Sequence, residues 1–240
     1  MTKENRRPYI ELLITFTILV LMLVMAYWLD PDRGSMAFAR KTQCVNRLTN
    51  IRLALLNYHA DYGSFPPTWV TDENGKPLYS WRVLLLPYLD LKPLYDLYHL
   101  DEPWDSPQNI QYSRAKLTIF QCPLNEHGPA TTNYVAVLSE HGPWRGEEAV
   151  SKDEIGELPE GVLLVVEQHG EKIHWAEPRD LDLATLPLYI NDDSGHGIGS
   201  PHADGANVSL LKNGRVEFLE DSLSSAELLK RLRLEAETKP

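Results

Sequence analysis

The stretch YIELLITFTILVLMLVMAYWL, residues 9–29, decides the architecture of this chain, because it is apolar almost without interruption. As a helix it would extend about 30 Å, which is the thickness of the hydrocarbon core of a bilayer. Its Leu, Ile, Val and Phe side chains together contribute roughly −3 to −6 kcal/mol to insertion. The sequence therefore predicts a transmembrane helix over residues 9–29, with Leu29 as its last apolar residue.

The charges that flank this run predict its orientation. Lys3, Arg6 and Arg7 precede the run, whereas Asp30 and Asp32 follow it. Basic residues beside a membrane span are retained on the cytoplasmic side. We therefore expect a single-pass protein of the inner (cytoplasmic) membrane, with residues 1–8 in the cytoplasm and the remaining chain in the periplasm or another extracytoplasmic space.

Two other interpretations of the run remain open. A cleaved signal peptide would end at a small-x-small sequence, and Ala37-Phe38-Ala39 has that form. The apolar part of a signal peptide is about 7–15 residues long, however, and this run is longer. A buried helix of a soluble protein is the third interpretation. The length of the run favours a retained anchor.

Glu11 lies next to Leu12 at the cytoplasmic edge of the run. It is interpreted either as a carboxylate that stays among the lipid headgroups or as an acid inside the membrane with a partner, since such buried charges are usually functional. Its position at the edge favours the first interpretation.

Length and charge limit the classes of function. A chain of 240 residues is enough for one anchor and one globular domain. The first thirty residues contain three basic and three acidic residues, so the net charge of −11 belongs to the exported part. Such a charge argues against a nucleic-acid partner and against docking on anionic lipid. It is compatible with a divalent cation without indicating one, so we predict no cofactor.

An amphipathic helix is expected after the anchor. Pro31 and Gly34 predict a break over residues 30–35, because proline and glycine interrupt helices. A helix then follows over residues 36–62, where apolar residues recur at spacings of three and four. The seam consists of Cys44, Leu48, Ile51, Leu55, Tyr58 and Tyr62.

The remaining chain alternates short apolar runs with turn residues. Residues 81–89 and 91–99 predict short helices, whereas residues 117–122, 133–138 and 161–167 predict strands. Residues 207–211 and 215–219 alternate around Asn213-Gly214, which is typical of a hairpin. Ser222 is expected to cap a last helix that starts at Leu223, within a C-terminal helix and tail over 223–240.

These elements predict an α+β fold. We expect an exported domain over residues 36–222, in which the long amphipathic helix packs on a small antiparallel sheet with short helical insertions. An isolated helix of this kind would be marginal in water, so its seam must be covered.

The chain contains two cysteines, Cys44 and Cys122. In an oxidising compartment they are candidates for a disulfide, which would close a long loop and contribute about 4 kcal/mol. The alternative is two separate thiols, with Cys44 packed as a small apolar residue. The Cys and His residues lack the spacing that is typical of structural zinc sites.

Candidates for metal binding are weak. His196, His202 and Asp204 lie in one glycine-rich loop and could bind a divalent metal. Asp192 and Asp193 could supply oxygen ligands to calcium, although they lack the alternating spacing of a calcium loop. Both groups are explained more simply as turn residues, since Asn, Asp, Ser and Gly favour turns.

Catalytic motifs are equally sparse. The sequence contains neither a serine elbow of the form G-x-S-x-G nor a phosphate-binding glycine loop. Aromatic residues crowd into residues 62–104, among them Trp81 and Trp104, and such a lobe could bind a glycan or a peptide. Aromatic residues more often cover the core of a turn-rich lobe, and we therefore predict no catalytic residue.

Seven segments together resemble a known family. They resemble the bacterial domain-of-unknown-function family of pilin-like proteins that is abundant in planctomycetes. The resemblance implies a fold like that of type II secretion pseudopilins, in which the apolar half of one N-terminal helix lies in the membrane and its amphipathic half lies on an antiparallel sheet. It also implies pilin-like or secretion-system proteins as partners. The segments are residues 43–67 (QCVNRLTNIRLALLNYHADYGSFPP), 80–90, 99–109, 120–123 (FQCP), 131–137, 173–181 and 199–219 (GSPHADGANVSLLKNGRVEFL).

The chain departs from this family at two places. Glu11 matches the glutamate of the family's prepilin signature, but Arg6 and Arg7 stand where the family has Gly and Phe around the scissile bond. We therefore expect no prepilin-type cleavage, which puts filament assembly in doubt. The family's H-x9-DG motif is replaced by His202, ten further residues and Asn213-Gly214.

Three observations lead to one prediction: the apolar anchor, the family resemblance and the lack of a catalytic motif. Together they predict a non-enzymatic, membrane-anchored, pilin-like protein of the cell envelope, with a structural or secretion-associated role. Two alternatives are an extracytoplasmic metal-dependent hydrolase and a module that binds a glycan or a peptide.

Overall fold

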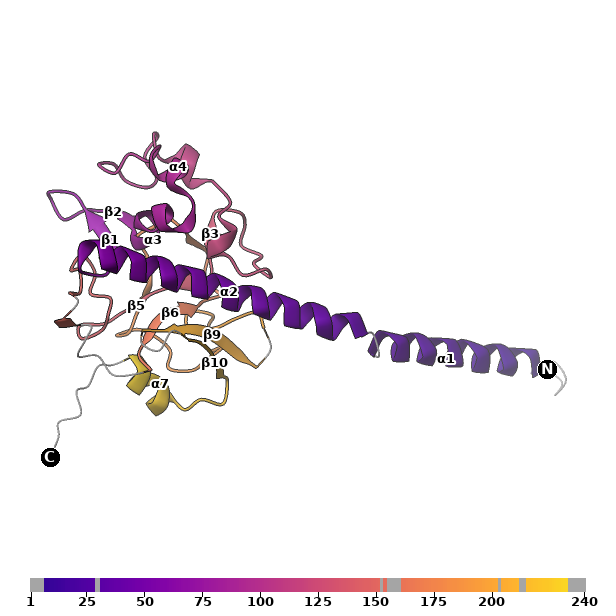
Figure 1. Ribbon diagram of the computed structural model, residues 1–240. Coiled ribbons are helices and arrows are strands. Elements are labelled where there is room, and N and C mark those ends of the chain that lie inside the picture. The colour runs from indigo at the N-terminus through magenta and orange to yellow at the C-terminus, as the bar shows by residue number, and fades with distance from the viewer. Residues whose placement is uncertain are drawn as a thin grey trace, which may run out of the picture. The chain divides into compact units, whose positions relative to one another are not determined.

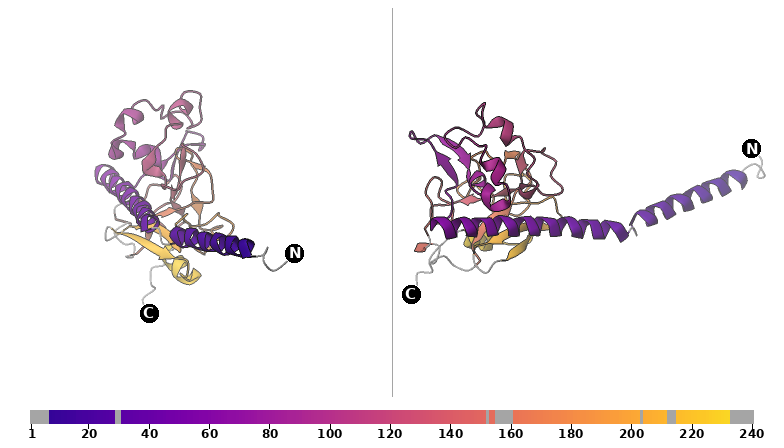
Figure 2. Two further views of the ribbon diagram at one scale, coloured as in Figure 1. Left: turned by 90° about the vertical axis from the view of Figure 1, so that its right-hand side faces the viewer. Right: turned by 45° about the horizontal axis from the view of Figure 1, so that its top comes forward.

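The computed structural model describes residues 7–28, 31–151, 153–154, 161–202, 204–211 and 215–232. The chain forms two compact units, Met1–Ala39 and Arg40–Pro240. Figure 1 and Figure 2 show the elements of each unit.

The first unit contains α1 (Arg7–Trp28) and the beginning of α2 (Pro31–Tyr62). The predicted break over residues 30–35 is wrong in its extent, because α2 begins at Pro31 and continues through Gly34. Proline is well tolerated in the first turn of a helix, where its missing N–H would have no partner, and one interior glycine costs only about 1 kcal/mol. Asp30 and Leu29 lie outside the described residues.

The described side chains of α1, residues 11–25, are exposed throughout. The large apolar side chains from Leu12 to Met25 each retain between 41% and 71% of their accessible surface. The two threonine hydroxyls donate to carbonyls of the same helix, Thr15 to Glu11 and Leu12, and Thr17 to Leu13. Over the residues that the structure describes, no helix combines the length and the hydropathy that a membrane span requires.

In the second unit, α2 packs along the sheet through the predicted seam. Cys44, Leu48, Ile51 and Leu55 are fully buried, which confirms the 3–4 spacing. The seam ends earlier than predicted, because Tyr58 is only partly buried and Tyr62 is 65% exposed.

A buried cation reinforces this packing. Arg52 donates from Nε to the Leu210 carbonyl over 3.0 Å, so that α2 is tied to the end of a strand.

The main sheet has four antiparallel strands. Their order is β10 (Val216–Glu220), β9 (Gly205–Leu210), β6 (Leu163–Glu167) and β4 (Tyr134–Val135), so β10 and β4 form its two edges. Strands β9 and β10 pair from Ser209↔Val216 to Gly205↔Glu220, which confirms the predicted hairpin strands. Residues 212–214, where its turn was predicted, lie outside the described residues.

The described residues also form three two-stranded pairs. They are β1 (Trp69–Thr71) with β2 (Pro77–Ser80), β3 (Thr131–Thr132) with β7 (Ile173–His174), and β5 (Val137–Leu138) with β8 (Leu181–Asp182), of which only the last is parallel.

Short helices form the lobe between β2 and β3. The predicted helical regions 81–89 and 91–99 are confirmed by α3 (Trp81–Leu84), η2 (Leu86–Leu89) and α4 (Lys92–Tyr95). A further helix, α5 (Ile110–Ser113), follows them. The strand predicted over residues 117–122 is wrong, because Thr118–Phe120 forms the 3₁₀ helix η3. Here the backbone of Phe120 and Cys122 bonds Asn133 instead of a strand ladder.

The last helix, α7 (Ser225–Leu232), starts two residues later than predicted. The hydroxyl of Ser224, not that of Ser222, accepts the N–H of Glu227 over 3.3 Å. Leu228 and Leu232 are buried, and residues 233–240 lie outside the described part of the chain.

The sheet separates two apolar clusters. Leu48, Ile51 and Leu55 of α2 pack with Trp81, Trp144 and Trp175 in the first cluster. The opposite cluster joins Val166 and Val208 of the sheet to Leu228 of α7, and the views in Figure 1 and Figure 2 show α2 and α7 on different sides of the strands. The fold is thus α+β with a small antiparallel sheet, as expected.

Candidate functional site

Four chemically reactive side chains from distant parts of the chain meet beside α2. Cys44 comes from α2, Cys122 from the segment after η3, Glu167 from the end of β6, and His202 from the loop before β9. One ligand atom from each side chain lies within 4.8 Å of all the others. We call these four residues the thiol–imidazole cluster. The cluster is buried, since His202 is 8% exposed and the other three are at most 3% exposed.

The sulfur atoms of the cluster lie close together without being bonded. The Sγ atoms of Cys44 and Cys122 are 3.3 Å apart, and both residues are free thiols. A disulfide requires about 2.05 Å. The candidate disulfide is therefore not formed in this structure, although the two cysteines do meet.

The imidazole contacts both sulfur atoms. Nε2 of His202 lies 3.2 Å from Sγ of Cys44 and 3.5 Å from Sγ of Cys122. The backbone N–H of His202 donates to Ser200 Oγ, which fixes the loop at this point. Nearby, the backbone N–H of Cys122 donates to Oδ1 of Asn133 over 2.8 Å.

The carboxylate of the cluster is held on one side only. Oε2 of Glu167 accepts the backbone N–H of Asn207 over 2.7 Å and its side-chain amide over 2.9 Å. Oε1 of Glu167 is buried and, within the described part of the chain, has no hydrogen-bond partner. A buried carboxylate oxygen without a partner is unusual, because its desolvation is costly.

The proximity of these groups perturbs their protonation. The thiol of Cys44 donates to Sγ of Cys122. This hydrogen bond is the larger cause, and burial the smaller one, of a raised pKa of Cys44. The same hydrogen bond lowers the pKa of Cys122. The contact with Cys44 raises the pKa of His202. Burial raises the pKa of Glu167 against the opposing effect of its bonds to Asn207. Of the two thiols beside this imidazole and carboxyl, Cys122 is thus the one whose ionisation is favoured.

The predicted metal residues in the glycine-rich loop are only partly brought together. His202 enters the cluster, but His196 is exposed and its Nδ1 lies 3.0 Å from a carboxylate oxygen of Glu171. Asp204 is exposed and has a positive φ of 72°. Among the described residues, neither His196 nor Asp204 belongs to a group with the geometry of a metal site.

The predicted calcium residues form a turn. Asp192 accepts both the N–H and the hydroxyl of Ser194, and these bonds lower the pKa of Asp192. Asp193 is exposed. This arrangement is the turn that their residue types favour.

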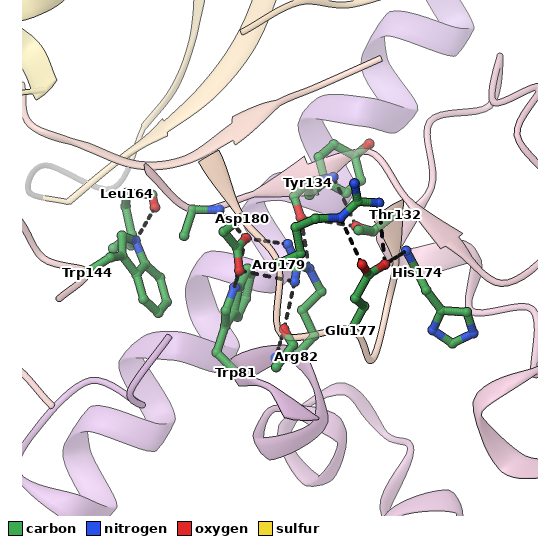
Figure 3. A network of polar contacts seen from close by, with 12 residues as sticks. Trp81, Arg82, Thr132, Tyr134, Trp144, Leu164, His174, Glu177, Arg179 and Asp180 are labelled. Atoms are coloured by element: carbon green, nitrogen blue, oxygen red, sulfur yellow. Dashed lines mark hydrogen bonds and ion pairs between the residues drawn. The ribbon is translucent and has the colours of Figure 1, made fainter. Parts of the chain in front are cut away.

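Of the two aromatic candidates, Trp81 lies in a second polar network, which Figure 3 shows. Trp81 is fully buried, and its indole N–H points to the carboxylate of Asp180 at 3.2 Å. Trp104 is partly buried and its ring lies 4.4 Å from that of His174. Trp81 is therefore a core residue and offers no surface to a glycan.

The centre of that network is a buried ion pair. Arg82 and Asp180 expose no side-chain surface, and their nearest atoms are 2.5 Å apart. Arg82 also donates to Ser80 Oγ and to the Tyr134 carbonyl, whereas Asp180 accepts the N–H of Ala136. Both oxygens of Asp180 and all three nitrogens of Arg82 have hydrogen-bond partners, and the bond to Tyr134 links α3 to β4 of the main sheet.

Comparison with known proteins gives a family without an activity. No curated protein and no solved structure matches the chain. A family model described as "Protein of unknown function (DUF1559)" matches residues 37–156, which are 120 of the 240 residues and include Cys44 and Cys122. The chain therefore belongs to this family of unknown function, DUF1559.

Proposed function

We propose that the chain is a membrane-anchored, pilin-like protein of the cell envelope, in which residues 9–29 lie in the inner membrane and the α+β unit lies outside the cytoplasm. Its role in this proposal is structural or secretion-associated rather than catalytic. The observation that carries the proposal is the uncovered apolar surface of α1.

The apolar surface of α1 is more stable in contact with lipid than with water. Apolar side chains from Leu12 to Met25 are exposed on every side of α1, whereas a soluble helix would expose a polar face. The hydroxyls of Thr15 and Thr17 bond to backbone carbonyls of the same helix, so that they need no water. In a hydrocarbon environment each polar group has to be satisfied internally. In sequence the apolar run continues to Leu29.

The arrangement of the second unit supports the comparison with pilins. The amphipathic part of α2 packs its seam on an antiparallel sheet, and the apolar helix precedes it in the chain. Arg6 and Arg7 favour a cytoplasmic N-terminus. Such a protein would present its acidic domain outside the membrane and offer it to neighbouring pilin-like or secretion proteins.

A paired substitution tests the anchor. Leu19→Lys places a charge in the middle of the run and should raise the free energy of insertion by about 3 kcal/mol. Leu53→Lys is the matched control, because Leu53 is a 48% exposed leucine of α2 outside the run. The full-length chain is expressed with each change, and membranes are extracted with alkaline carbonate.

We expect the wild type and Leu53→Lys to stay in the carbonate-resistant membrane fraction, and Leu19→Lys to shift to the soluble fraction or to be degraded. N-terminal sequencing of the membrane-bound protein should read the intact start. A wild-type chain that is soluble with its first residues intact would contradict the proposal, and so would a cut after Ala39.

A further inference from the structure

We propose that Cys44, Cys122, Glu167 and His202 bind one Zn²⁺ ion, and that this ion fastens α2 to the sheet. The proposal does not rest on the membrane anchor, because all four residues belong to the second unit.

The donor set selects the class of metal. Two cysteine sulfurs and one imidazole nitrogen are ligands that zinc prefers, and a carboxylate oxygen is a common further ligand. Calcium and magnesium prefer sites made of oxygen atoms. The thiol–imidazole cluster therefore points to a borderline-soft divalent ion rather than to a hard one.

The spacing of the donors fits one ion. Zn–S bonds of about 2.3 Å and Zn–N bonds of about 2.0–2.1 Å give tetrahedral edges of about 3.5–3.8 Å. The three distances among Cys44 Sγ, Cys122 Sγ and His202 Nε2 are 3.3, 3.2 and 3.5 Å. A small outward movement of these side chains would admit the ion at their centre.

Glu167 supplies independent support. Its Oε1 is buried and has no hydrogen-bond partner among the described residues, and one carboxylate oxygen of Glu167 belongs to the group of ligand atoms within 4.8 Å. Asn207 engages the other oxygen through two hydrogen bonds and thereby orients the carboxylate. A bound cation would satisfy Oε1, and Asn207 would act as an outer partner that positions a ligand.

The arrangement is that of a structural site. Four protein ligands fill a tetrahedral coordination sphere, whereas catalytic zinc keeps one position for water or substrate. The four ligands come from α2, the segment after η3, β6 and the loop before β9. One ion would thus join segments that are separated by up to 158 positions.

Binding requires proton release and no redox change. Zinc binds thiolates and neutral imidazole, so the thiol protons of Cys44 and Cys122 leave to solvent as the two Zn–S bonds form. The ion remains Zn²⁺ throughout.

The test measures metal in the full-length chain, purified in detergent from cells grown with zinc. We expect about one zinc per chain by elemental mass spectrometry. Removal of the zinc and addition of Co²⁺ should produce the charge-transfer absorption of cobalt thiolate. His202→Gln and Glu167→Gln should weaken zinc binding at least about 100-fold, and Asn207→Ala about 10- to 100-fold.

Matched controls distinguish the cluster from surface binding. His196→Gln and Glu171→Gln change an exposed imidazole and its carboxylate partner, and both should leave the zinc content unchanged. Should Cys44→Ser or Cys122→Ser fail to fold, the wild type still decides the matter: bound zinc should protect both thiols from alkylation, and chelation should expose them.

Three results would overturn the proposal. They are a folded wild-type chain without zinc whose thiols react freely, a covalent link between the Cys44 and Cys122 peptides, and zinc that is retained in both His202→Gln and Glu167→Gln.

Discussion

Arg82 and Asp180 form a salt bridge of 2.5 Å in which neither side chain is exposed to solvent. The two residues are 98 positions apart and join the start of α3 to the loop before β8. Such a pair contributes little net stability relative to apolar residues, but the loss of one partner leaves a buried charge unpaired.

Asp180→Asn tests this asymmetry. The substitution keeps the size of the side chain but removes the charge that faces Arg82, so we expect a loss of about 3–5 kcal/mol in the free energy of unfolding. Urea unfolding followed by tryptophan fluorescence measures it. Asp96→Asn is the control, because its pair with Lys92 is exposed and should be worth less than about 0.5 kcal/mol. Equal losses in the two variants would refute the structural role of the buried pair.

His174 should make stability depend on pH. Burial lowers the pKa of His174 to about 4, and its Nδ1 accepts the N–H of Ala176, which requires a neutral ring. In the unfolded chain the imidazole of His174 has a pKa of about 6.5. Between about pH 4 and about pH 6.5 the imidazole is therefore protonated in the unfolded chain but neutral in the folded chain. These two values correspond to a loss of about 3 kcal/mol in stability as the pH drops from about 7 to about 4, and solvent screening of the partly buried ring reduces it to about 2 kcal/mol.

His174→Asn isolates that contribution, because the amide oxygen can still accept from Ala176 but does not titrate. Unfolding midpoints measured across this pH range should fall less steeply in the variant than in the wild type. The exposed His196 serves as the comparison, and His196→Gln should keep the wild-type slope. If the His174→Asn and wild-type profiles run parallel, His174 does not account for the pH dependence.

Gly170 is required by a close backbone approach. A Cβ atom at this position would lie 2.2 Å from the carbonyl oxygen of Gly195. Because both partners are backbone, Gly170→Ala should cost about 1–3 kcal/mol through displacement of the loop. A Cβ at Gly197 meets its nearest neighbour at 3.5 Å, so Gly197→Ala should be nearly neutral. Thermal unfolding midpoints of the two variants test this difference. A Gly170→Ala variant with the stability of the wild type would show that the backbones at Gly170 and Gly195 do not approach closely.

Trp144 combines packing with one specific hydrogen bond. Its indole N–H donates to the Leu164 carbonyl over 2.6 Å, and the residue is 1% exposed. Trp144→Phe keeps an aromatic ring but leaves that carbonyl unpaired, so we expect a loss of about 1–3 kcal/mol beyond the smaller ring volume. Trp104→Phe changes a partly buried indole and should cost less. Chemical denaturation measures the free energy of unfolding of both variants, and a larger loss in Trp104→Phe than in Trp144→Phe would contradict the prediction.

Patterns along the sequence predicted most of the regular elements. The four-residue and three-residue spacing from Cys44 to Leu55 marks the buried face of α2, and the apolar run over residues 161–167 marks β6. The predictions of secondary structure were wrong where tertiary contacts, rather than the local sequence pattern, determine the conformation of the backbone. Phe120 looks like a strand residue, but the side chain and backbone of Asn133 take the bonds that a neighbouring strand would have made.

The thiol–imidazole cluster could not be read from spacing, because its residues lie on four separate segments. The sequence predicts the two cysteines as a candidate disulfide pair and His202 as a separate metal candidate, but nothing in it joins His202 to the cysteines. Glu167 was missed altogether, since it ends an apolar strand and resembles a residue that turns to solvent. An acidic residue at the end of a fully buried strand was the one available signal.

The position of β10 at one side of the sheet has a consequence for solubility. Its outer backbone groups pair with no strand among the described residues, and a neighbouring molecule could extend the sheet there. Glu217 and Glu220 lie on this strand, and Arg231 of α7 reaches Glu217 over 2.9 Å. Charged side chains at an open margin oppose intermolecular strand addition. We therefore expect this strand to resist fibrillar self-association even where many copies are crowded together.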